Sequence, residues 1–397
     1  MEERAETWYN YTGRMIGEKL FPRGGGERLL RGKRRFLMKF IHTGDLHLGS
    51  KMGTRLTPDK AAARKAELRS TFKRMADYAS ENGCTAVLLC GDVFDENEPL
   101  LDDKNYFYHV VSAHPDVYFA YLKGNHDTGD HFSEDAPENL LTFGNDWRYY
   151  EFGDVRVYGT ELPEKGARAA AARLSTDSNF VNIVMLHGQI GSSADSIVIQ
   201  DYAGKGIDYL ALGHVHSYSK GQIDMWGEYA YCGTPEGRGF DETGEKGFVL
   251  VETDRPGARV ETRFVPFAQR TVHEFRVDIS GTASKEDALD VCEEAVSGAK
   301  NRDLVRLLIE GATRFDTDGL DTALENSLGG RFFALSVKNL STEEPDYEAF
   351  LNEVSLRGEF ARKLAADTSL SDADKKRIAA LGFKALAGNL REDIKVR

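Results

Sequence analysis

The sequence predicts an α/β protein. From residue 38 onward, short apolar segments alternate with helical stretches, which is the pattern of a layered α/β fold. Asp and His residues follow directly after several apolar segments, where open α/β sheets place their functional sites. The chain has 397 residues, enough for one large domain and one or two small ones.

The predicted core elements follow one another in a regular order. We expect strands at 39–43, 85–90, 117–122, 148–152, 155–159, 181–186 and 209–212, and helices at about 58–82 and 102–113. Pro58 suits the first turn of the first helix, and Gly83 ends it. Residues 229–266 have the pattern of antiparallel β-structure.

Two further parts follow the core. Residues 271–339 have the order strand, helix, strand, helix, strand, with the elements at 273–279, 285–299, 304–310, 318–327 and 332–337. This order predicts a compact second domain. Beyond Ser341 the chain is helical and charged, with apolar residues at helical spacing: Phe350, Val354, Leu356, Phe360 and Leu364. Two interpretations of this tail stay open, because it can pack on its own domain or form a pair of docking helices.

Residues 1–37 differ in character from the rest. They mix Arg, Gly and Glu without an apolar period. They also lack the continuous apolar region and the cleavage site of a secretory signal. We expect translation to begin at Met38 and the preceding residues to be a disordered leader.

Composition restricts the classes of function. No apolar run approaches the roughly 20 residues that cross a bilayer, so no membrane association is expected. The four cysteines form no Cys-x-x-Cys pair, which predicts reduced thiols in a cytoplasmic protein. The net charge of −13 disfavours nucleic-acid binding, although bound divalent cations would reverse the charge of acidic ligands locally. Six cations near the motifs can line a groove or be solvated surface charges: Lys51, Arg55, Lys123, Lys205, Lys220 and Arg238.

Five short segments carry the candidate chemistry, and each follows an apolar strand. They are Gly44-Asp45-Leu46-His47, Gly91-Asp92-Val93-Phe94-Asp95, Gly124-Asn125-His126-Asp127, Leu186-His187-Gly188 and Gly213-His214-Val215-His216. Each segment alone is a weak signal, since an Asp-x-His sequence is usually a surface pair. Together they supply carboxylate, imidazole and amide ligands in the proportions that divalent metals need. Residues two apart on extended backbone point the same way, so Asp45 and His47 can act as a pair, as can His214 and His216.

In this order the segments resemble the motifs of the calcineurin-like metallophosphoesterase superfamily, over residues 39–264. The resemblance implies a four-layer β-sandwich core flanked by helices, and two divalent metal ions. It implies seven metal ligands, with Asp92 bridging both ions: Asp45, His47 and His216 for one ion, and Asn125, His187 and His214 for the other.

Roles for other residues follow from the same resemblance. His126 is expected to contact a phosphate oxygen or to protonate the leaving group. Asp127 is expected to orient His126, and Asp95 to support the site in the same way, although a loop-stabilising hydrogen bond is the other interpretation of both. Five histidines match no motif and are expected to be structural or surface residues: His42, His109, His114, His131 and His273.

The second motif bears on the kind of phosphoester. Phosphoprotein phosphatases of this superfamily continue it with Asp-Arg-Gly, whose Arg grips a terminal phosphate, whereas this chain has Asp95-Glu96-Asn97. The missing Arg favours a phosphodiester. The first, second and fourth motifs resemble the SbcD-type nuclease subunit of DNA double-strand-break repair. The segments 233–240 and 244–247 and the tail are similar to the YhaO-like branch of that group.

This closer resemblance implies a domain plan and a function. It implies a nuclease domain at 38–268, a DNA-holding capping domain at 269–340 and a helical tail at 341–397 that docks on an SMC-like coiled-coil ATPase. The expected protein is a DNA exonuclease or endonuclease subunit in DNA repair that uses two Mn²⁺ ions and can be a homodimer. Two alternatives stay open: a small-molecule or cyclic-nucleotide phosphodiesterase, and a mainly structural subunit that tethers DNA ends.

Overall fold

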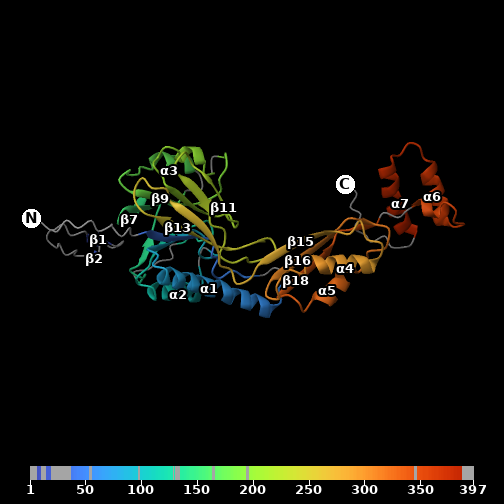
Figure 1. The fold of residues 1–397 in the computed structure, drawn as a ribbon, viewed down its shortest axis with the longest axis horizontal. Coiled ribbons are helices and arrows are strands. Elements are labelled where there is room, and N and C mark those ends of the chain that lie inside the picture. The colour runs from blue at the N-terminus through green and yellow to red at the C-terminus, as the bar shows by residue number, and fades with distance from the viewer. Residues whose placement is uncertain are drawn as a thin grey trace, which may run out of the picture. The chain divides into compact units, whose positions relative to one another are not determined.

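The computed structural model describes most of the chain (Figure 1). The described residues are 7–9, 15–18, 37–52, 56–96, 99–127, 129, 135–162, 166–193, 196–343 and 347–386. The chain divides into two compact units, Met1–Arg270 and Thr271–Arg397. The predicted leader lies largely outside the described residues, as do Arg55 and His131. Its described parts, β1 (Thr7–Tyr9) and β2 (Met15–Glu18), form an antiparallel pair.

Two six-stranded sheets form the centre of the first unit. The first sheet has the order β14 (Glu261–Pro266), β13 (Gly247–Thr253), β3 (Met38–Thr43), β4 (Ala86–Cys90), β5 (Tyr118–Leu122) and β6 (Leu140–Thr142). The second has the order β11 (Ser219–Gln222), β12 (Glu228–Tyr231), β10 (Tyr209–Gly213), β9 (Val181–His187), β8 (Val155–Gly159) and β7 (Arg148–Phe152). Strands β3 to β6 are parallel neighbours, and so are β8, β9, β10 and β12.

Strand β4 shows why the central strands have continuous apolar sequences. All five of its residues are buried. Val87 and Leu89 belong to the core under the helices, whereas Leu88 and Cys90 belong to the core between the sheets. Because successive side chains point to opposite faces, a strand that is covered on both faces needs apolar residues at every position.

Helices cover the outer face of each sheet and complete four layers. Helices α1 (Pro58–Glu81) and α2 (Leu101–Ser112) cover the first sheet, where Phe72 and Phe107 stack with their ring centroids 5.3 Å apart. The short helix α3 (Ala167–Arg173) shares a core with the outer face of the second sheet. Figure 1 shows α1 and α2 on one side of the sheets and α3 on the other. The predicted α/β fold with a four-layer core is therefore confirmed.

The region 229–266 differs in part from the expectation of antiparallel structure. Strands β13 and β14 are antiparallel, and β12 is antiparallel to β11. However, β12 also lies parallel to β10 and so extends the second sheet. The reason is the tight connection between β11 and β12, which reverses the chain and returns it along β10. Periodicity within one strand carries no information on the direction of its neighbours.

The second unit contains a three-stranded parallel sheet. Its strands are β15 (Val272–Asp278), β16 (Leu304–Glu310) and β18 (Ala334–Asn339), in that order. Helices α4 (Lys285–Ala295) and α5 (Leu320–Leu328) share one apolar core with the sheet. A short parallel pair, β17 (Ala312–Thr313) and β19 (Thr342–Glu343), accompanies them. The strand and helix order is the one expected from the sequence, although α4 ends at Ala295 and not at residue 299.

The tail contains a 3₁₀ turn, η2 (Tyr347–Phe350), and two helices, α6 (Leu356–Ala366) and α7 (Asp372–Leu386). Their apolar side chains form a cluster of their own: Ala361, Leu364, Ala379 and Phe383, with Tyr347, Phe350, Leu351, Phe360 and Leu370 around them. The expected apolar stripe is wrong at Val354 and Leu356, which are 101% and 71% exposed. The Ser355 side chain caps α6, so Val354 precedes the helix and cannot lie on its face.

Neither disulfides nor membrane helices contribute to the described fold. No helix in the described part of the chain is long and apolar enough to cross a membrane. All four cysteines are free and buried: Cys84, Cys90, Cys232 and Cys292. Burial raises the pKa of the Cys84 and Cys292 thiols to about 11, so both stay protonated at neutral pH.

His42 ties the two sheets together inside the first unit. Its Nδ1 accepts a hydrogen bond from the Tyr209 hydroxyl at 2.7 Å, and its Nε2 donates to the Leu212 carbonyl at 3.2 Å. The ring is completely buried. Burial lowers the pKa of His42 to about 3, although the hydrogen bond to Leu212 acts in the opposite direction. His42 is therefore neutral in the fold and has a structural position.

The depressed pKa of His42 predicts a pH dependence of stability. In the unfolded chain a histidine has a pKa of about 6.5. The unfolded state therefore binds more protons than the folded state between about pH 3 and 6.5, and stability falls as the pH drops through this window. We expect the urea midpoint, followed by tryptophan fluorescence, to fall more steeply from pH 7 to pH 5 in the parent than in His42→Gln. Equal slopes would contradict this prediction.

Candidate metal centre

The five motif loops meet at one end of the two sheets. Asp45 follows β3, Asp92 follows β4 and Asn125 follows β5, all at the carboxyl ends of parallel strands. His187 ends β9, and His214 follows β10, in the second sheet. The parallel direction of these strands is what gathers the loops at one edge.

Glycines make the close approach of these loops possible. Gly91 has φ +86°, and a Cβ on it would lie 2.2 Å from the Nδ1 of His187. A Cβ on Gly124 would lie 2.1 Å from the Oδ1 of Asp92. Any side chain at either position would displace a predicted ligand, so glycine is required at both.

Four predicted ligands have a left-handed backbone. The φ angles are 50° for Asp45, 46° for His47, 50° for Asp92 and 97° for His214. Such conformations cost on the order of 1–3 kcal/mol each and persist only where neighbouring structure holds them. Here the loops hold one another. The amide of Asp45 donates to the Gly91 carbonyl at 2.9 Å, that of His47 donates to the Asp92 carbonyl at 3.0 Å, and that of His214 donates to the Asp45 carboxylate at 3.0 Å.

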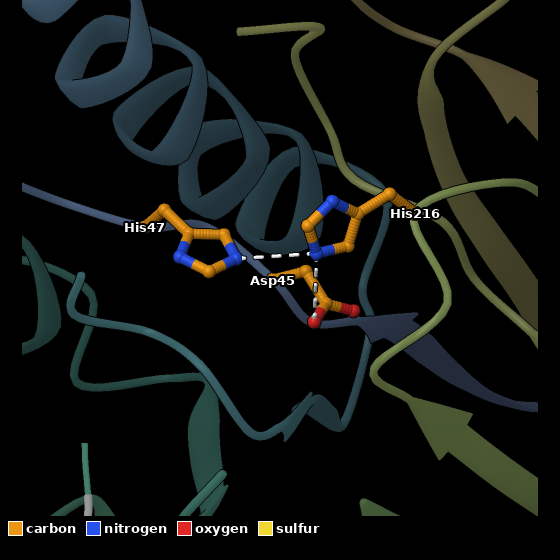
Figure 2. A group of neighbouring side chains, drawn as sticks. All are labelled: Asp45, His47 and His216. Atoms are coloured by element: carbon orange, nitrogen blue, oxygen red, sulfur yellow. Dashed lines mark hydrogen bonds and ion pairs between the residues drawn. The ribbon is translucent and has the colours of Figure 1, made fainter. Parts of the chain in front are cut away.

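Asp45, His47 and His216 form the first cluster (Figure 2). The Nε2 atoms of His47 and His216 are 3.3 Å apart, and the Nε2 of His216 lies 3.7 Å from the Oδ1 of Asp45. One ligand atom from each residue lies within 4.8 Å of the other two. The structure thus brings together the three residues that the resemblance assigned to one metal ion.

The second cluster lies beside the first and is joined to it by Asp92. Asp92, His187 and His214 offer ligand atoms within 4.8 Å of one another. The Oδ1 of Asn125 is 2.9 Å from the Nε2 of His187 and 3.0 Å from the Nδ1 of His214. The Oδ2 of Asp92 is 3.5 Å from the Nε2 of His187 and 4.0 Å from the Nε2 of His47. Asp92 therefore stands between the clusters, where a bridging ligand is expected.

An oxygen atom lies within 3 Å of the outward nitrogen of three rings. The Nδ1 of His187 donates to the Cys90 carbonyl at 2.9 Å, and the Nδ1 of His216 donates to Glu242 at 2.8 Å. The Nδ1 of His47 lies 2.8 Å from the Oδ1 of Asp95. Each ring, when neutral, consequently turns the lone pair of its Nε2 toward the clusters. Several lone pairs that face one another without donors are an arrangement that a divalent cation satisfies, so this donor set fits a metal.

The charges within the clusters depend on one another. Burial is the largest effect on the pKa of His187 and lowers it, but Asp92 and Asp45 outweigh burial and raise this pKa to about 9. Burial raises the pKa of Asp45 to about 6. Burial acts in the same direction on Asp92, but the hydrogen bond and charge of His187 hold the pKa of Asp92 well below its usual range. Metal binding would therefore displace a proton from His187.

His126 and Asp127 have different environments. His126 is exposed, its amide donates to Asp92 at 2.8 Å, and its ring centroid lies 5.1 Å from that of His47. Asp127 is fully buried, and its carboxylate accepts hydrogen bonds from the Val93 amide at 2.9 Å, the Gly124 amide at 2.6 Å and the Tyr121 hydroxyl at 2.8 Å. These contacts fix the loop backbone, as expected if Asp127 serves to stabilise the loop by hydrogen bonds. The orientation of His126 by Asp127 stays a prediction.

Sequence reasoning missed Glu242, the partner of His216. Glu242 is buried and also accepts hydrogen bonds from Arg238. It lies two residues beyond the segment 233–240, whose similarity to repair nucleases was the available signal. Periodicity could not separate Glu242 from the exposed acid Asp241 beside it.

The six cations proposed for a DNA groove can also be placed. Arg55 lies outside the described residues, and the other five all contact protein groups. The contacts are Lys51 with Glu96 at 2.9 Å, Lys123 with Glu161 at 3.8 Å, Lys205 with the Leu174 carbonyl at 3.3 Å, Lys220 with Glu228 at 4.0 Å, and Arg238 with Asp95 at 3.0 Å. Their contacts within the protein do not define a groove for DNA.

A comparison with known families finds a match within the first unit. The calcineurin-like phosphoesterase family matches residues 38–218, the stretch that carries His126 and all seven predicted ligands. Residues 38–218 form a calcineurin-like phosphoesterase domain. This confirms the superfamily that the motifs indicated.

The names of several relatives agree with the closer resemblance. The chain is 32% identical to the uncharacterized metallophosphoesterase YhaO of Bacillus subtilis over 241 residues, which are 54% of this chain and 57% of YhaO. It is 22% identical to the DNA double-strand break repair protein Mre11 of Saccharolobus solfataricus, over 69% of this chain and 76% of that protein. It is 24% identical to a component of the nuclease SbcCD of Escherichia coli K12, over 65% of this chain and 76% of that component. The chain thus spans little more than half the length of YhaO.

The donor set predicts that divalent metal stabilises the fold. A ligand that binds only the folded state raises its stability by mass action. With free Mn²⁺ at about a hundred times its Kd, we expect the Tm of the first unit to rise by roughly 5–10 °C, and EDTA to reverse the rise. Asp92→Asn should lose most of this rise, whereas Asp201→Asn, on the helical turn η1 (Ile199–Tyr202), should keep it. Scanning calorimetry with and without Mn²⁺ tests this, and an equal rise in both variants would contradict the bridging position of Asp92.

Proposed function

We propose that this chain is a dinuclear-metal phosphodiesterase that cleaves DNA with Mn²⁺, as a nuclease subunit in DNA repair. The observation that carries the proposal is the meeting of two ligand clusters about one carboxylate, Asp92. The names of the relatives support a DNA substrate, since they include a DNA double-strand break repair protein and part of a nuclease.

The ligands divide between two ions in this proposal. Asp45, His47 and His216 would hold one ion, while Asn125, His187 and His214 would hold the other, and Asp92 would bridge them. When bound, such a pair of ions makes a water molecule acidic enough to act as hydroxide and neutralises charge on the phosphoryl oxygens. The carboxylate and amide oxygens suit Mn²⁺, whereas the imidazole nitrogens also suit Zn²⁺ and Fe²⁺, so the choice of Mn²⁺ rests on the resemblance to the repair nucleases.

The chain's own residues would supply proton transfer and positioning. His126 is the exposed imidazole beside the clusters, so it can reach a phosphate oxygen or the leaving group. The backbone amide of His126 donates a hydrogen bond to Asp92. The position of His126 therefore depends on that of the proposed bridging carboxylate. Asp127 holds the loop that carries His126.

The surroundings of the second motif favour a diester. Glu96 occupies the position where phosphatases of the superfamily carry an Arg, and here it pairs with Lys51 at 2.9 Å. This position therefore offers no cation that could grip the dianionic end of a phosphomonoester. An internal phosphodiester carries one negative charge and has no terminal phosphate to be gripped.

Mn²⁺-dependent degradation of end-labelled linear DNA tests the proposed function. We expect the purified chain to degrade the DNA, and Asp92→Asn to slow degradation by more than about 100-fold because both ions lose a ligand. Asp201→Asn serves as the matched control and should retain the parent rate. His126→Gln should slow cleavage while Mn²⁺ binding stays unchanged, which separates proton transfer from metal binding.

An aryl phosphodiester assayed in parallel separates the alternatives. Cleavage of the aryl diester without loss of DNA would favour a small-molecule phosphodiesterase. Absence of both activities in a chain that binds two Mn²⁺ ions would favour the DNA-tethering role. The position of the surviving end label reports the polarity of cleavage.

A partner surface is proposed on the tail. The helices α6 and α7 bury apolar residues against each other, yet Leu356 on α6, Leu381 on α7 and Val354 just before α6 remain 71%, 51% and 101% exposed. Exposed apolar side chains on a helix pair are typical of a docking surface for another helical protein. We propose that these residues dock on an SMC-like coiled-coil ATPase.

The docking proposal predicts a separation of binding from cleavage. Leu356→Asp combined with Val354→Asp should weaken co-purification with the ATPase of the same host by at least about tenfold, because it places charges in an apolar interface. The nuclease rate of the isolated chain should not change. Unchanged co-purification would refute the docking surface.

The homodimer and the cytoplasmic location remain predictions. Sedimentation analysis of the purified chain tests whether it is a homodimer.

A further inference from the structure

Two carboxylates from distant parts of the first unit support the first cluster. Asp95, after β4, places its Oδ1 2.8 Å from the Nδ1 of His47. Glu242, before β13, places its Oε1 2.8 Å from the Nδ1 of His216. Both contacts are at the nitrogen that faces away from the cluster, so each carboxylate can fix the tautomer and rotation of its ring.

Arg238 joins these two carboxylates. Its Nη1 donates to the Oδ1 of Asp95 at 3.0 Å, while its Nε and Nη2 donate to the Oε1 of Glu242 at 3.1 and 2.9 Å. Its backbone amide donates to the other oxygen of Glu242 at 2.7 Å. A planar guanidinium can hold two carboxylates in fixed directions, whereas a lysine ammonium offers one point charge.

The backbone next to Arg238 is itself anchored inside the unit. The carboxylate of Glu236 is buried and accepts hydrogen bonds from Arg64 at 3.0 Å and from Thr71 at 2.9 Å, both on α1. The carbonyl of Gly237 accepts a second hydrogen bond from Arg64 at 2.6 Å. Arg64 is completely buried. The position of Arg238 is thus set by α1, and not only by its own ion pairs.

Asp95 also belongs to a third group of side chains that could bind a cation. His47, Asp95 and His126 offer ligand atoms within 4.8 Å of one another, so they could hold a cation outside the first cluster. The positive charge of Arg238 at 3.0 Å from Asp95 opposes a cation at that position.

We propose that Arg238 is a positioning residue for the first metal ion. Through Asp95 and Glu242 it sets the orientation of His47 and His216, and it keeps Asp95 from drawing a cation toward His126. The proposal rests on the proposed function, since it requires that Asp45, His47 and His216 hold a metal ion.

Titration calorimetry of Mn²⁺ into the full chain tests this role. The parent is expected to bind two ions. Arg238→Gln should weaken one of the two sites by about 10–100-fold and leave the other unchanged, the size found when groups that orient metal ligands are removed. Arg238→Lys should restore part of the affinity. The matched control is Arg156→Gln, because Arg156 is also largely buried and bridges two carboxylates, Glu151 and Asp177, away from the clusters.

Electron paramagnetic resonance supplies a readout that a general loss of structure would not reproduce. We expect the parent with two equivalents of Mn²⁺ to give the signal of a coupled pair. Arg238→Gln should give the signal of an isolated ion at the same concentration, and the coupled signal should return at higher Mn²⁺. Equal weakening of both sites, or two unchanged sites, would overturn the positioning role.

The outcomes also separate this proposal from the proposed function. A parent chain that binds no Mn²⁺ would overturn both. A parent that binds two ions and cleaves DNA, with Arg238→Gln identical to it in affinity and spectrum, would overturn the role of Arg238 alone. If Arg238→Gln lowers the Tm more than Arg156→Gln does, Glu242→Gln carries the same test, because it removes the charge that links Arg238 to His216 and leaves Arg238 and Asp95 in place.

Discussion

The close approach of the two sheets at the carboxyl ends of β4 and β10 is the constraint on which the candidate site depends. A Cβ on Gly213 would lie 1.8 Å from the Cys90 carbonyl oxygen, so only glycine permits this distance. The same carbonyl accepts the hydrogen bond of His187, and thereby turns the other nitrogen of that ring toward Asp92. Each sheet carries only some of the predicted ligands. Their contact at this end brings these residues together in one site.

Strain and charge are concentrated at the same place. Asp45, His47, Asp92 and His214 all have positive φ angles, and the loops that contain them are hydrogen-bonded to one another. Backbone strain of this kind persists only where the surrounding structure is rigid. Here the strands that carry the loops are fixed in two sheets, and His42 links these sheets by buried hydrogen bonds. The interdependent pKa values of His187 and the two aspartates have the same origin, since several ionisable groups share one buried space. A divalent metal would satisfy the facing lone pairs.

Side chains outside the two clusters contact the clustered histidines, so the site extends beyond the five motifs. Glu242 and Asp95 contact the outward nitrogens of His216 and His47, and Arg238 connects the two carboxylates. The pair of Arg64 and Glu236 then links this region to α1. The helical layer is therefore hydrogen-bonded to the segment that carries Arg238, in addition to its part in the core. Four carboxylates are gathered here, since Asp45 and Asp92 belong to the clusters and Asp95 and Glu242 contact their histidines.

The sequence by itself determined the α/β class, most strand and helix positions, and the set of residues that meet at the site. It could do so because strand burial on both faces leaves continuous apolar runs, and because ligands that follow parallel strands must gather at one edge. Only the tertiary structure decided that β12 lies along β10, that Val354 is outside the helix, that Asp127 holds a loop, and that Glu242 and Arg238 contact His216. These outcomes depend on contacts between residues far apart in the chain or on the path of a loop, and neither leaves a periodic signal in the sequence.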